Sequence, residues 1–212
     1  VLDVNVGAAG VDAVAALPAA VLALVGATDL PLVLDTTDPA ALEAALRVYP
    51  GRALINSVNG DPESMAAVMP LAAYYGAAIV VLALDDTGIP GTSEGRMEIV
   101  ERVRRKAHAW KLTDSDLVVD GLVMTAATDA SAPATTLEVV AACTEMGLAT
   151  TLGVSNVSHG LPDRPLLNAA FLTAAAARGL TSAIVNPNDR VVMEALRMAE
   201  KAGLIKYMPG DP

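Results

Sequence analysis

Residues 31–60 read PLVLDTTDPAALEAALRVYPGRALINSVNG, and this stretch contains the pattern that decides the fold. An apolar run ends at Asp35, the pair Asp38-Pro39 follows, and an Ala/Leu-rich segment then continues at helical spacing. Aspartate before proline is typical of a helix N-cap with proline at the first helical position. Pro50-Gly51 interrupts the chain before a second apolar run that contains Asn56. The stretch therefore predicts a strand, a helix and a second strand.

The same succession of apolar run, polar loop and helical segment repeats along the chain. Strands are expected at 1–6, 31–35, 53–58, 78–84, 117–122, 149–154 and 183–185. Helices are expected at 11–25, 39–49, 62–75, 93–110, from Pro133 to 146, 165–178 and 190–202. Strict alternation implies parallel strands with right-handed crossovers, and so an α/β fold.

Seven strand–helix units are one fewer than the eight that close a TIM (β/α)8 barrel. An open, doubly wound sheet is the alternative to a barrel that lacks one unit. An apolar strand at residue 1, with no initiator Met, favours a barrel whose first unit lies upstream of this sequence. No linker or shift in composition divides the chain, so we expect residues 1–212 to form a single domain.

The composition excludes several classes of function. Fourteen basic and twenty-four acidic residues give a formal charge of −10, which argues against binding to nucleic acid or to a membrane surface. One cysteine, Cys143, rules out a disulfide framework and favours a reducing cytoplasmic setting. The apolar runs are too short to predict a transmembrane span. Gly7-Ala8-Ala9-Gly10 lacks the third glycine of a dinucleotide-binding fingerprint.

Polar side chains recur where the predicted strands end: Asp35, Asn56, Asp85, Asp86, Asp120, Ser155, Asn156 and Asn186. The C-terminal strand ends of a parallel barrel open on one face, where such barrels bind ligands. Polar groups on several strands at the same end are better explained by a shared ligand than by chance. The strongest functional candidates are Asp35, Asn56, Asp120 and Asn156. Asn5, Asp85, His159 and Asn186 are further candidates to line the pocket.

Other polar residues receive a structural interpretation. Asp38, Asp61 and Ser93 are interpreted as helix caps or loop hydrogen-bonding residues, and Cys143 as a small core residue. The remaining strand-end set consists of carboxylates and carboxamides, and the sequence places no Arg or Lys there. A single histidine, His159, does not make a zinc site. Carboxylates and amides complement an amino-pyrimidinone edge, which presents N–H donors and a carbonyl acceptor.

Several segments in register resemble one family. They are Leu34–Pro39 (LDTTDP), Leu54–Asn59 (LINSVN), Gly88–Pro90 (GIP), Val119–Leu122 (VDGL) and Gly153–Ser158 (GVSNVS). These segments are similar to the methyltetrahydrofolate:corrinoid/iron-sulfur protein methyltransferases and to the folate domain of cobalamin-dependent methionine synthase. The resemblance extends from residue 1 to about residue 205.

The resemblance implies a TIM barrel that binds the pterin of methyltetrahydrofolate at its C-terminal mouth. Asp35, Asn56 and Asp120 match the family positions that hydrogen-bond the pterin, and Asn156 matches an asparagine that contacts it near N5. Ser155 is the neighbour of Asn156, and His159 lies where some relatives carry Gln. The family also carries an acidic residue in a Gly-Glu-Arg-Ile-Asn-like first strand. No such segment occurs here, which supports the expectation of an upstream first unit.

The implied activity is methyl exchange between N5 of methyltetrahydrofolate and the cobalt of a cobalamin-type corrinoid carried by a separate partner protein, with a homodimer as the implied assembly. Asn156 would stabilise a protonated N5, and Asp35 and Asp120 would orient the ring. One alternative is dihydropteroate synthase, whose diphosphate leaving group needs the basic residues that the sequence does not place at the strand ends. The others are a non-catalytic folate-binding subunit and a barrel enzyme with a divalent metal at Asp85 or Asp86.

Overall fold

The computed structural model describes residues 1–204 as alternating parallel strands and helices, which form two compact units. The first unit contains residues 1–87 and 99–118, and the second contains residues 88–98 and 119 onward. Helix α4 (Ser93–Ala109) begins in the second unit and ends in the first, whereas strand β5 (Leu117–Asp120) begins in the first and ends in the second. Each unit is described by itself.

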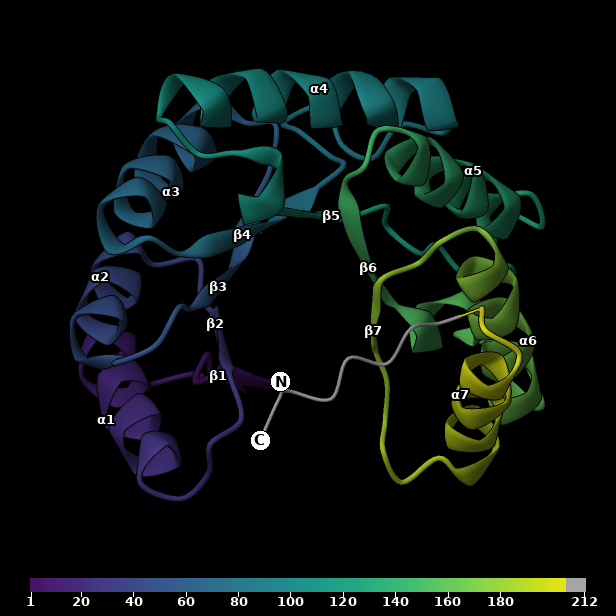
Figure 1. Cartoon of the computed structure of the whole chain (residues 1–212), viewed down its shortest axis with the longest axis horizontal. Coiled ribbons are helices and arrows are strands. Elements are labelled where there is room, and N and C mark those ends of the chain that lie inside the picture. The colour runs from purple at the N-terminus through teal and green to yellow at the C-terminus, as the bar shows by residue number, and fades with distance from the viewer. Residues whose placement is uncertain (205–212) are drawn as a thin grey trace. The chain divides into compact units, whose positions relative to one another are not determined.

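The first unit is a parallel sheet with helices on one face (Figure 1). Its elements are β1 (Leu2–Asn5), α1 (Ala13–Val25), β2 (Leu32–Asp35), α2 (Pro39–Val48), β3 (Leu54–Val58), α3 (Pro62–Tyr75), β4 (Ala78–Leu82) and the 3-10 helix η1 (Asp114–Asp116). Each of β2, β3 and β4 pairs in parallel with the strand that precedes it in the chain.

The second unit continues the same alternation. Its elements are α5 (Ala132–Glu145), β6 (Ala149–Gly153), the 3-10 helix η2 (Val154–Ser158), α6 (Arg164–Ala177), β7 (Ser182–Ile184) and α7 (Arg190–Lys201). Strand β7 pairs in parallel with β6, from Thr151 opposite Ser182 to Gly153 opposite Ile184. Within the described residues, every predicted strand and helix is present, with ends within about two residues of the expected ones. The predicted α/β class is therefore confirmed.

Local capping signals account for several helix starts. The Asp38 carboxylate accepts from the Ala40 N–H at 2.9 Å, and Asp61 accepts from the Glu63 N–H at 2.9 Å. Both predicted caps are confirmed, each with proline in the first turn. Ser93 has a structural contact, as expected, but it is not the helix cap. Its hydroxyl donates to Glu138 of α5 at 2.7 Å, and the neighbouring Thr92 hydroxyl instead accepts from the Gly95 N–H at 3.2 Å.

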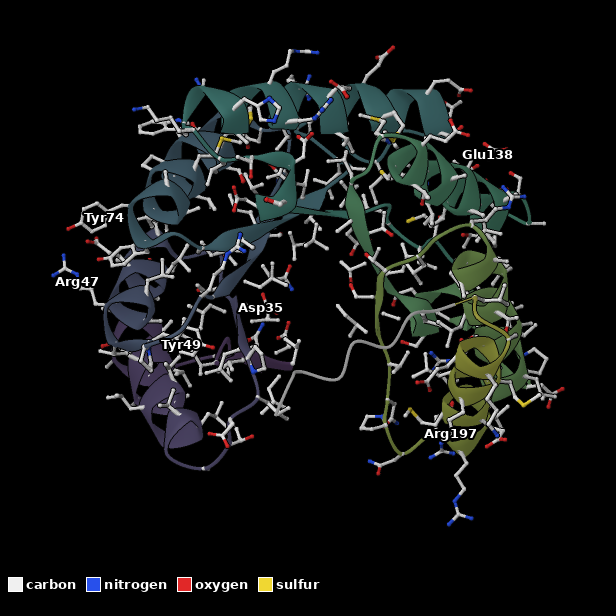
Figure 2. All side chains as sticks on the ribbon, in the orientation of Figure 1. Asp35, Arg47, Tyr49, Tyr74, Glu138 and Arg197 are labelled. Carbon is white, nitrogen blue, oxygen red and sulfur yellow. The ribbon has the colours of Figure 1, made fainter. Side chains whose placement is uncertain are left out.

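One face of the sheet in the first unit is apolar, and the other face carries polar residues beside buried valines such as Val33 and Val80. Val4, Leu34, Ile55 and Ile79 occupy matching positions of β1 to β4 and are almost completely buried. Because successive strand residues point to opposite faces, the residues that flank this row project to the side away from the helices. Figure 2 shows one of them, Asp35, on the side of β2 opposite α1 and α2. The face without helices therefore carries the polar strand residues.

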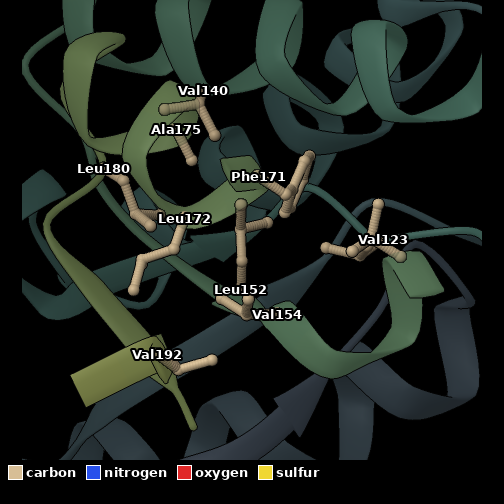
Figure 3. Packing of buried hydrophobic residues seen from close by; sticks show 10 residues of the cluster. Val123, Val140, Leu152, Val154, Phe171, Leu172, Ala175, Leu180 and Val192 are labelled. Carbon is tan, nitrogen blue, oxygen red and sulfur yellow. The ribbon is translucent and has the colours of Figure 1, made fainter. Parts of the chain in front are cut away.

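The second unit has its own hydrophobic core, which supports the strand ends of β5 and β6. Leu152 of β6 and Phe171 and Leu172 of α6 are at its centre, with Val123 from the loop after β5 and Val192 from α7 (Figure 3). The Cys143 side chain is fully buried and lies 3.8 Å from the Met97 sulfur, as expected for a core residue. Burial raises the pKa of the Cys143 thiol to about 12, so this cysteine is not a reactive thiolate at neutral pH.

Gly60 fills a position after β3 where no side chain fits, and Gly60→Ala is expected to destabilise the protein. A Cβ atom there would lie 2.6 Å from the Arg102 guanidinium and 2.7 Å from the side chain of Ile99, which is buried. The overpacking should cost about 1–3 kcal/mol of unfolding free energy, measured by urea denaturation. Gly26→Ala is the control, because its Cβ would meet nothing closer than 3.6 Å. Equal stabilities of the two variants would contradict the prediction.

None of the helices within residues 1–204 has both the length and the apolar character needed to cross a membrane.

Candidate functional site

In the first unit, the polar face of the sheet brings two carboxylates and two amides together. Asn5, Asp35 and Asn56 lie opposite one another on β1, β2 and β3. The Asn5 amide donates to Asp35 at 2.8 Å, and the Asn56 amide approaches the Asp3 carboxylate at 3.4 Å. Three residues that the sequence suggested, Asn5, Asp35 and Asn56, are thus placed side by side.

The array of Asp3, Asn5, Asp35 and Asn56 is short of positive charge. Partial burial and the neighbouring Asp35 carboxylate raise the pKa of Asp3, and the hydrogen bond from Asn56 opposes this shift. An ionised carboxylate has about four acceptor positions, and one amide N–H uses a fraction of them. The remaining acceptors suit a ligand edge with several N–H donors, such as the amino-pyrimidinone that the sequence suggested.

Asp3 is the residue of this array that sequence reasoning missed. Asp3 lies within the first strand and not at its C-terminal end, where ligand-binding residues of a parallel barrel are expected. A signal was present, since Asp3 and Asn5 are two residues apart and two-residue spacing places side chains on one face of a strand. A strand with Asp and Asn on the same face cannot be apolar on both faces.

Asp85 has a structural role at the end of β4. Its carboxylate accepts from the backbone N–H and the hydroxyl of Thr87 at 3.0 and 2.7 Å, and it forms an ion pair with Arg102. The Thr87 hydroxyl, followed by Arg102, lowers the pKa of Asp85. Asp86 is exposed in the same turn. Over residues 1–204, no group of three or more His, Cys, Asp or Glu side chains is arranged to hold a metal ion.

In the second unit, Asp120 ends β5 with its carboxylate partly buried. It accepts from the Leu122 N–H at 2.8 Å, across a turn in which Leu122 has a positive φ of 62°. Burial raises the pKa of Asp120 to about 6, although the Leu122 N–H and the Arg96 charge both lower it. A carboxylate held in this state is a strong acceptor for a buried N–H donor.

Arginine side chains do reach the strand ends, so the expectation that Arg and Lys are absent there is wrong. Arg96 donates to the carbonyl oxygens of Gly121 and Leu122 at 2.7 and 2.8 Å, directly after β5. Arg102 pairs with Asp85 after β4. Both arginines belong to α4, and their long side chains extend from the helix to the turns. Both are engaged with protein groups.

Asn156 lies in η2, the 3-10 helix directly after β6, and not in an irregular loop. Its side chain is exposed, and its amide nitrogen lies over Gly153, where a Cβ atom would approach to 3.2 Å. The backbone of η2 is held from α6: Arg164 donates to the Ser155 carbonyl at 3.0 Å, and Asn168 accepts from the Ser158 hydroxyl at 2.7 Å. Asn156 is therefore presented by a fixed turn.

The other pocket candidates are in exposed turns. The Asn186 side chain accepts from the Asn188 N–H at 3.0 Å, which is a local turn contact. His159 is exposed and follows η2, and its N–H donates to the Asn156 carbonyl at 3.2 Å. Ser155 is exposed beside Asn156. Their roles in ligand binding stay predictions.

Arg164→Met is expected to loosen η2 without unfolding the second unit. Arg164 donates to Ser155 and to the Ser158 hydroxyl, and hydrogen bonds from charged donors contribute about 1.5–3 kcal/mol. The amides of His159 and Ala126, which bond to Asn156 and Val157, should then exchange with solvent about tenfold faster or more. Arg178→Met, at the exposed end of the same helix, is the control. Unchanged hydrogen-exchange rates at both amides would show that Arg164 does not hold η2 in place.

Comparisons with known proteins show the family to which the chain belongs. The family model described as "Pterin binding enzyme" matches residues 1–186. The methionine synthase of Mycobacterium tuberculosis is 37% identical over 209 residues, which is 92% of this chain and 18% of that protein. The methylcorrinoid:tetrahydrofolate methyltransferase of Eubacterium limosum is 30% identical over 174 residues, which is 80% of this chain and 64% of that protein. The chain thus spans less than a fifth of the mycobacterial protein.

Solved structures share the fold. A dihydropteroate synthase of Yersinia pestis with a pterine–sulfa conjugate superimposes with a TM-score of 0.70 over 95% of this chain and 82% of that chain, at 18% identity. The Xanthomonas albilineans dihydropteroate synthase gives a TM-score of 0.69 over 95% of this chain and 79% of that chain, at 21% identity. The family model covers most of the sequence, so the chain belongs to the family of pterin binding enzymes.

Proposed function

We propose that this chain is the folate-binding part of a methyltransferase that moves a methyl group between N5 of methyltetrahydrofolate and the cobalt of a corrinoid protein. The observation that carries the proposal is the paired array of Asp3, Asn5, Asp35 and Asn56, an acceptor-rich surface suited to the N–H groups of a pterin. Relatives at 30–37% identity are named methionine synthase and methylcorrinoid:tetrahydrofolate methyltransferase, which favours methyl transfer as the reaction.

The proposed roles follow the chemistry of each group. Asp35, Asn56 and Asp120 bind the pterin as acceptors and donors, and Asp3 joins them as a further acceptor. Ser155 is a weaker candidate contact. Asn156 is the catalytic candidate, because a carboxamide can accept a hydrogen bond from a protonated N5.

Methyl transfer breaks the bond between N5 and the methyl carbon, and the electron pair of that bond stays on N5. A proton or a strong hydrogen bond at N5 makes this amine a better leaving group. The corrinoid cobalt of the partner protein supplies the nucleophile. The protein therefore needs no nucleophilic side chain of its own, which agrees with the inert, buried Cys143.

Dihydropteroate synthase is the alternative that shares the fold. The basic residues for a diphosphate were expected to be absent, yet Arg96 and Arg102 approach the strand ends. Both are bonded to protein groups, so a diphosphate would have to compete with the Gly121 and Leu122 carbonyls or with Asp85. The solved synthases are 14–21% identical to this chain and support the fold only.

One assay tests the proposal. The protein is mixed with methyltetrahydrofolate and a corrinoid protein reduced to Co(I), and the appearance of methylcobalamin absorbance is followed. Methyl transfer to cobalt is the expected result. Folate binding without transfer would leave a binding module, and failure to bind folate would overturn the assignment. Formation of dihydropteroate from a pterin diphosphate and p-aminobenzoate would establish the alternative.

A further inference from the structure

Arg96 is a buried arginine that the proposed reaction does not yet use. Its side chain is 2% exposed, although it stands in the first turn of α4. It continues the buried stripe of that helix, since Val100, Val103 and Ala107 follow at spacings of four, three and four residues and are also buried. A buried guanidinium is costly unless its N–H groups are hydrogen-bonded, so its contacts indicate what it is there to hold.

The Arg96 guanidinium clamps the turn that follows β5. Its Nη1 group donates to the carbonyl oxygens of Gly121 and Leu122, and it lies 3.2 Å from the Thr136 hydroxyl of α5. Its Nε group donates to the Pro90 carbonyl at 3.0 Å, which fixes the guanidinium against the loop before α4. The Thr136 hydroxyl also lies 3.0 Å from the Leu122 carbonyl. Arg96 of α4 and Thr136 of α5 thus both contact the Leu122 carbonyl, and the loop before α4 holds Arg96 in place.

Leu122 links this clamp to Asp120. The Leu122 N–H donates to the Asp120 carboxylate, and the Leu122 carbonyl accepts from Arg96. Leu122 has a positive φ, which is unfavourable for a residue with a bulky side chain. The contacts of Leu122 must therefore hold this conformation. Gly121 allows this turn to lie close to α5, because a Cβ atom at Gly121 would lie 3.1 Å from the Val139 side chain. Moving Arg96 would therefore move the donor that orients the Asp120 carboxylate.

We propose that Arg96 is a positioning residue for Asp120, holding the Gly121–Leu122 turn so that the carboxylate keeps the orientation in which it binds the pterin. The pterin in this statement rests on the proposed function. The clamp itself rests on the contacts of Arg96 and does not require a ligand. Arg96 acts through Asp120 and is not a catalytic residue.

The clamp also has an electrostatic consequence that can be measured without ligand. Within this unit, the groups that act on the Asp120 carboxylate are the Arg96 cation from α4 and the Leu122 N–H from the following turn. Both favour the ionised form and oppose the effect of burial. Removing the cation must therefore raise the pKa of Asp120 above its value of about 6.

The test compares Arg96→Met and Arg96→Lys with the unaltered protein. The Asp120 carboxyl is titrated by carbon NMR in the absence of ligand, with its signal assigned from Asp120→Asn. Arg96→Met should raise the apparent pKa by about one unit or more, because an opposite charge nearby lowers a carboxyl pKa by about 1–3 units. Arg96→Lys keeps the charge and should keep the pKa closer to that of the unaltered protein.

Folate affinity provides the second readout. At pH 7, Arg96→Met should weaken methyltetrahydrofolate binding about tenfold or more, with part of the loss recovered at pH 8.5 as Asp120 ionises. Arg96→Lys should also weaken binding, without the recovery at high pH, because the lysine side chain has one nitrogen and cannot hold the Pro90 carbonyl as well as the Gly121 and Leu122 carbonyls. Arg104→Met is the control, since Arg104 is on the same helix and pairs with Asp114.

The outcomes separate the two proposals. If the unaltered protein does not bind folate, the proposed function fails, and the ligand-free titration of Asp120 still decides the role of Arg96. An Asp120 pKa that is the same in Arg96→Met and in the unaltered protein would overturn the inference. Should Arg96→Met fail to fold by circular dichroism, Arg96→Lys and Thr136→Val test the same clamp. If Arg96→Lys and Thr136→Val both bind folate within about twofold of the affinity of the unaltered protein, the inference about Arg96 is likewise overturned.

Discussion

Replacing Asp120 by Asn is expected to weaken methyltetrahydrofolate binding by about 100-fold at pH 7 and, at the same pH, to stabilise the protein. The loss of affinity has a simple cause. A carboxylate accepts hydrogen bonds from N–H donors at both oxygens, whereas an amide offers one oxygen and turns its own N–H groups towards the ligand. Disrupting a buried, charged hydrogen-bonding pair costs about 2–5 kcal/mol, and each 1.4 kcal/mol is tenfold in affinity.

The gain in stability follows from the sign of the pKa shift. The pKa of Asp120 in the folded protein is about 6, above its usual value of 3.8, so the folded state binds a proton more readily than the unfolded state. Ionised Asp120 therefore destabilises the fold above pH 6, and this cost disappears as the pH falls from about 6 towards 4. A shift of roughly two units corresponds to at most about 3 kcal/mol.

Asp120→Asn should thus raise the unfolding free energy by about 1–3 kcal/mol at pH 7.5 and by much less at pH 4.5. Urea denaturation at the two pH values measures this difference, and a folate titration measures the affinity. The unaltered protein should lose folate affinity as the pH falls through about 6, whereas the variant should show no such step. Asp189→Asn is the control, because Asp189 caps α7 and Asn caps helices equally well. A variant less stable at both pH values would make Asp120 a structural residue.

A functional carboxylate is identified by two opposite effects of its replacement, a loss of ligand affinity and a gain in stability. A residue kept for stability loses both stability and function when it is replaced. A residue kept for a ligand against the preference of the fold loses function and gains stability. Asp38 and Asp61 illustrate the first kind, since each caps a helix. The partly buried position of Asp120 and its raised pKa illustrate the second kind.

Those features of the fold that arise from neighbouring residues could be predicted from the sequence. The Asp38-Pro39 and Asp61-Pro62 caps, the Pro50-Gly51 break and the apolar runs act within a few residues, and the structure confirms them. Alternation then implies parallel pairing, because a helix must return the chain to the same end of the sheet. The predicted capping residue was wrong only at the start of α4, where two residues with hydroxyl groups are adjacent. Thr92 and Ser93 both carry a hydroxyl that could cap the helix, and the backbone places the Thr92 hydroxyl at the Gly95 N–H.

The candidate site was harder to predict wherever a long side chain was involved. Asn5, Asp35 and Asn56 are short, so their position on a strand fixes where their polar atoms lie, and the structure brings them together. Arg96 and Arg102 start on α4 and end at strand-end turns. Their sequence positions therefore do not show which strand they reach. The hydrogen bond from Arg164 to the Ser155 carbonyl of η2 could not be predicted either, because the Arg164 side chain is equally long.

Asn156→Ala is expected to slow methyl transfer by about 100- to 1,000-fold while changing the folate dissociation constant by less than about tenfold. Removing one preorganised hydrogen-bonding group from a transition state costs rate by factors of this size. The unequal effect is expected because a proton on N5 develops mainly as the methyl group leaves. Ground-state binding instead depends on the pterin edge, which Asn156 is not proposed to hold.

Single-turnover transfer to a Co(I) corrinoid protein gives the rate, and a folate titration gives the dissociation constant. Asn188→Ala is the matched control, since Asn188 is an exposed asparagine in the turn after β7 of the same unit. Equal losses of rate and affinity would make Asn156 a binding residue. A rate unchanged in the variant would remove Asn156 from the reaction, and the Asp and Asn array of the first unit would then support folate binding alone. The comparison therefore separates binding of the pterin from catalysis on it, a distinction that the shared fold of the dihydropteroate synthases cannot make.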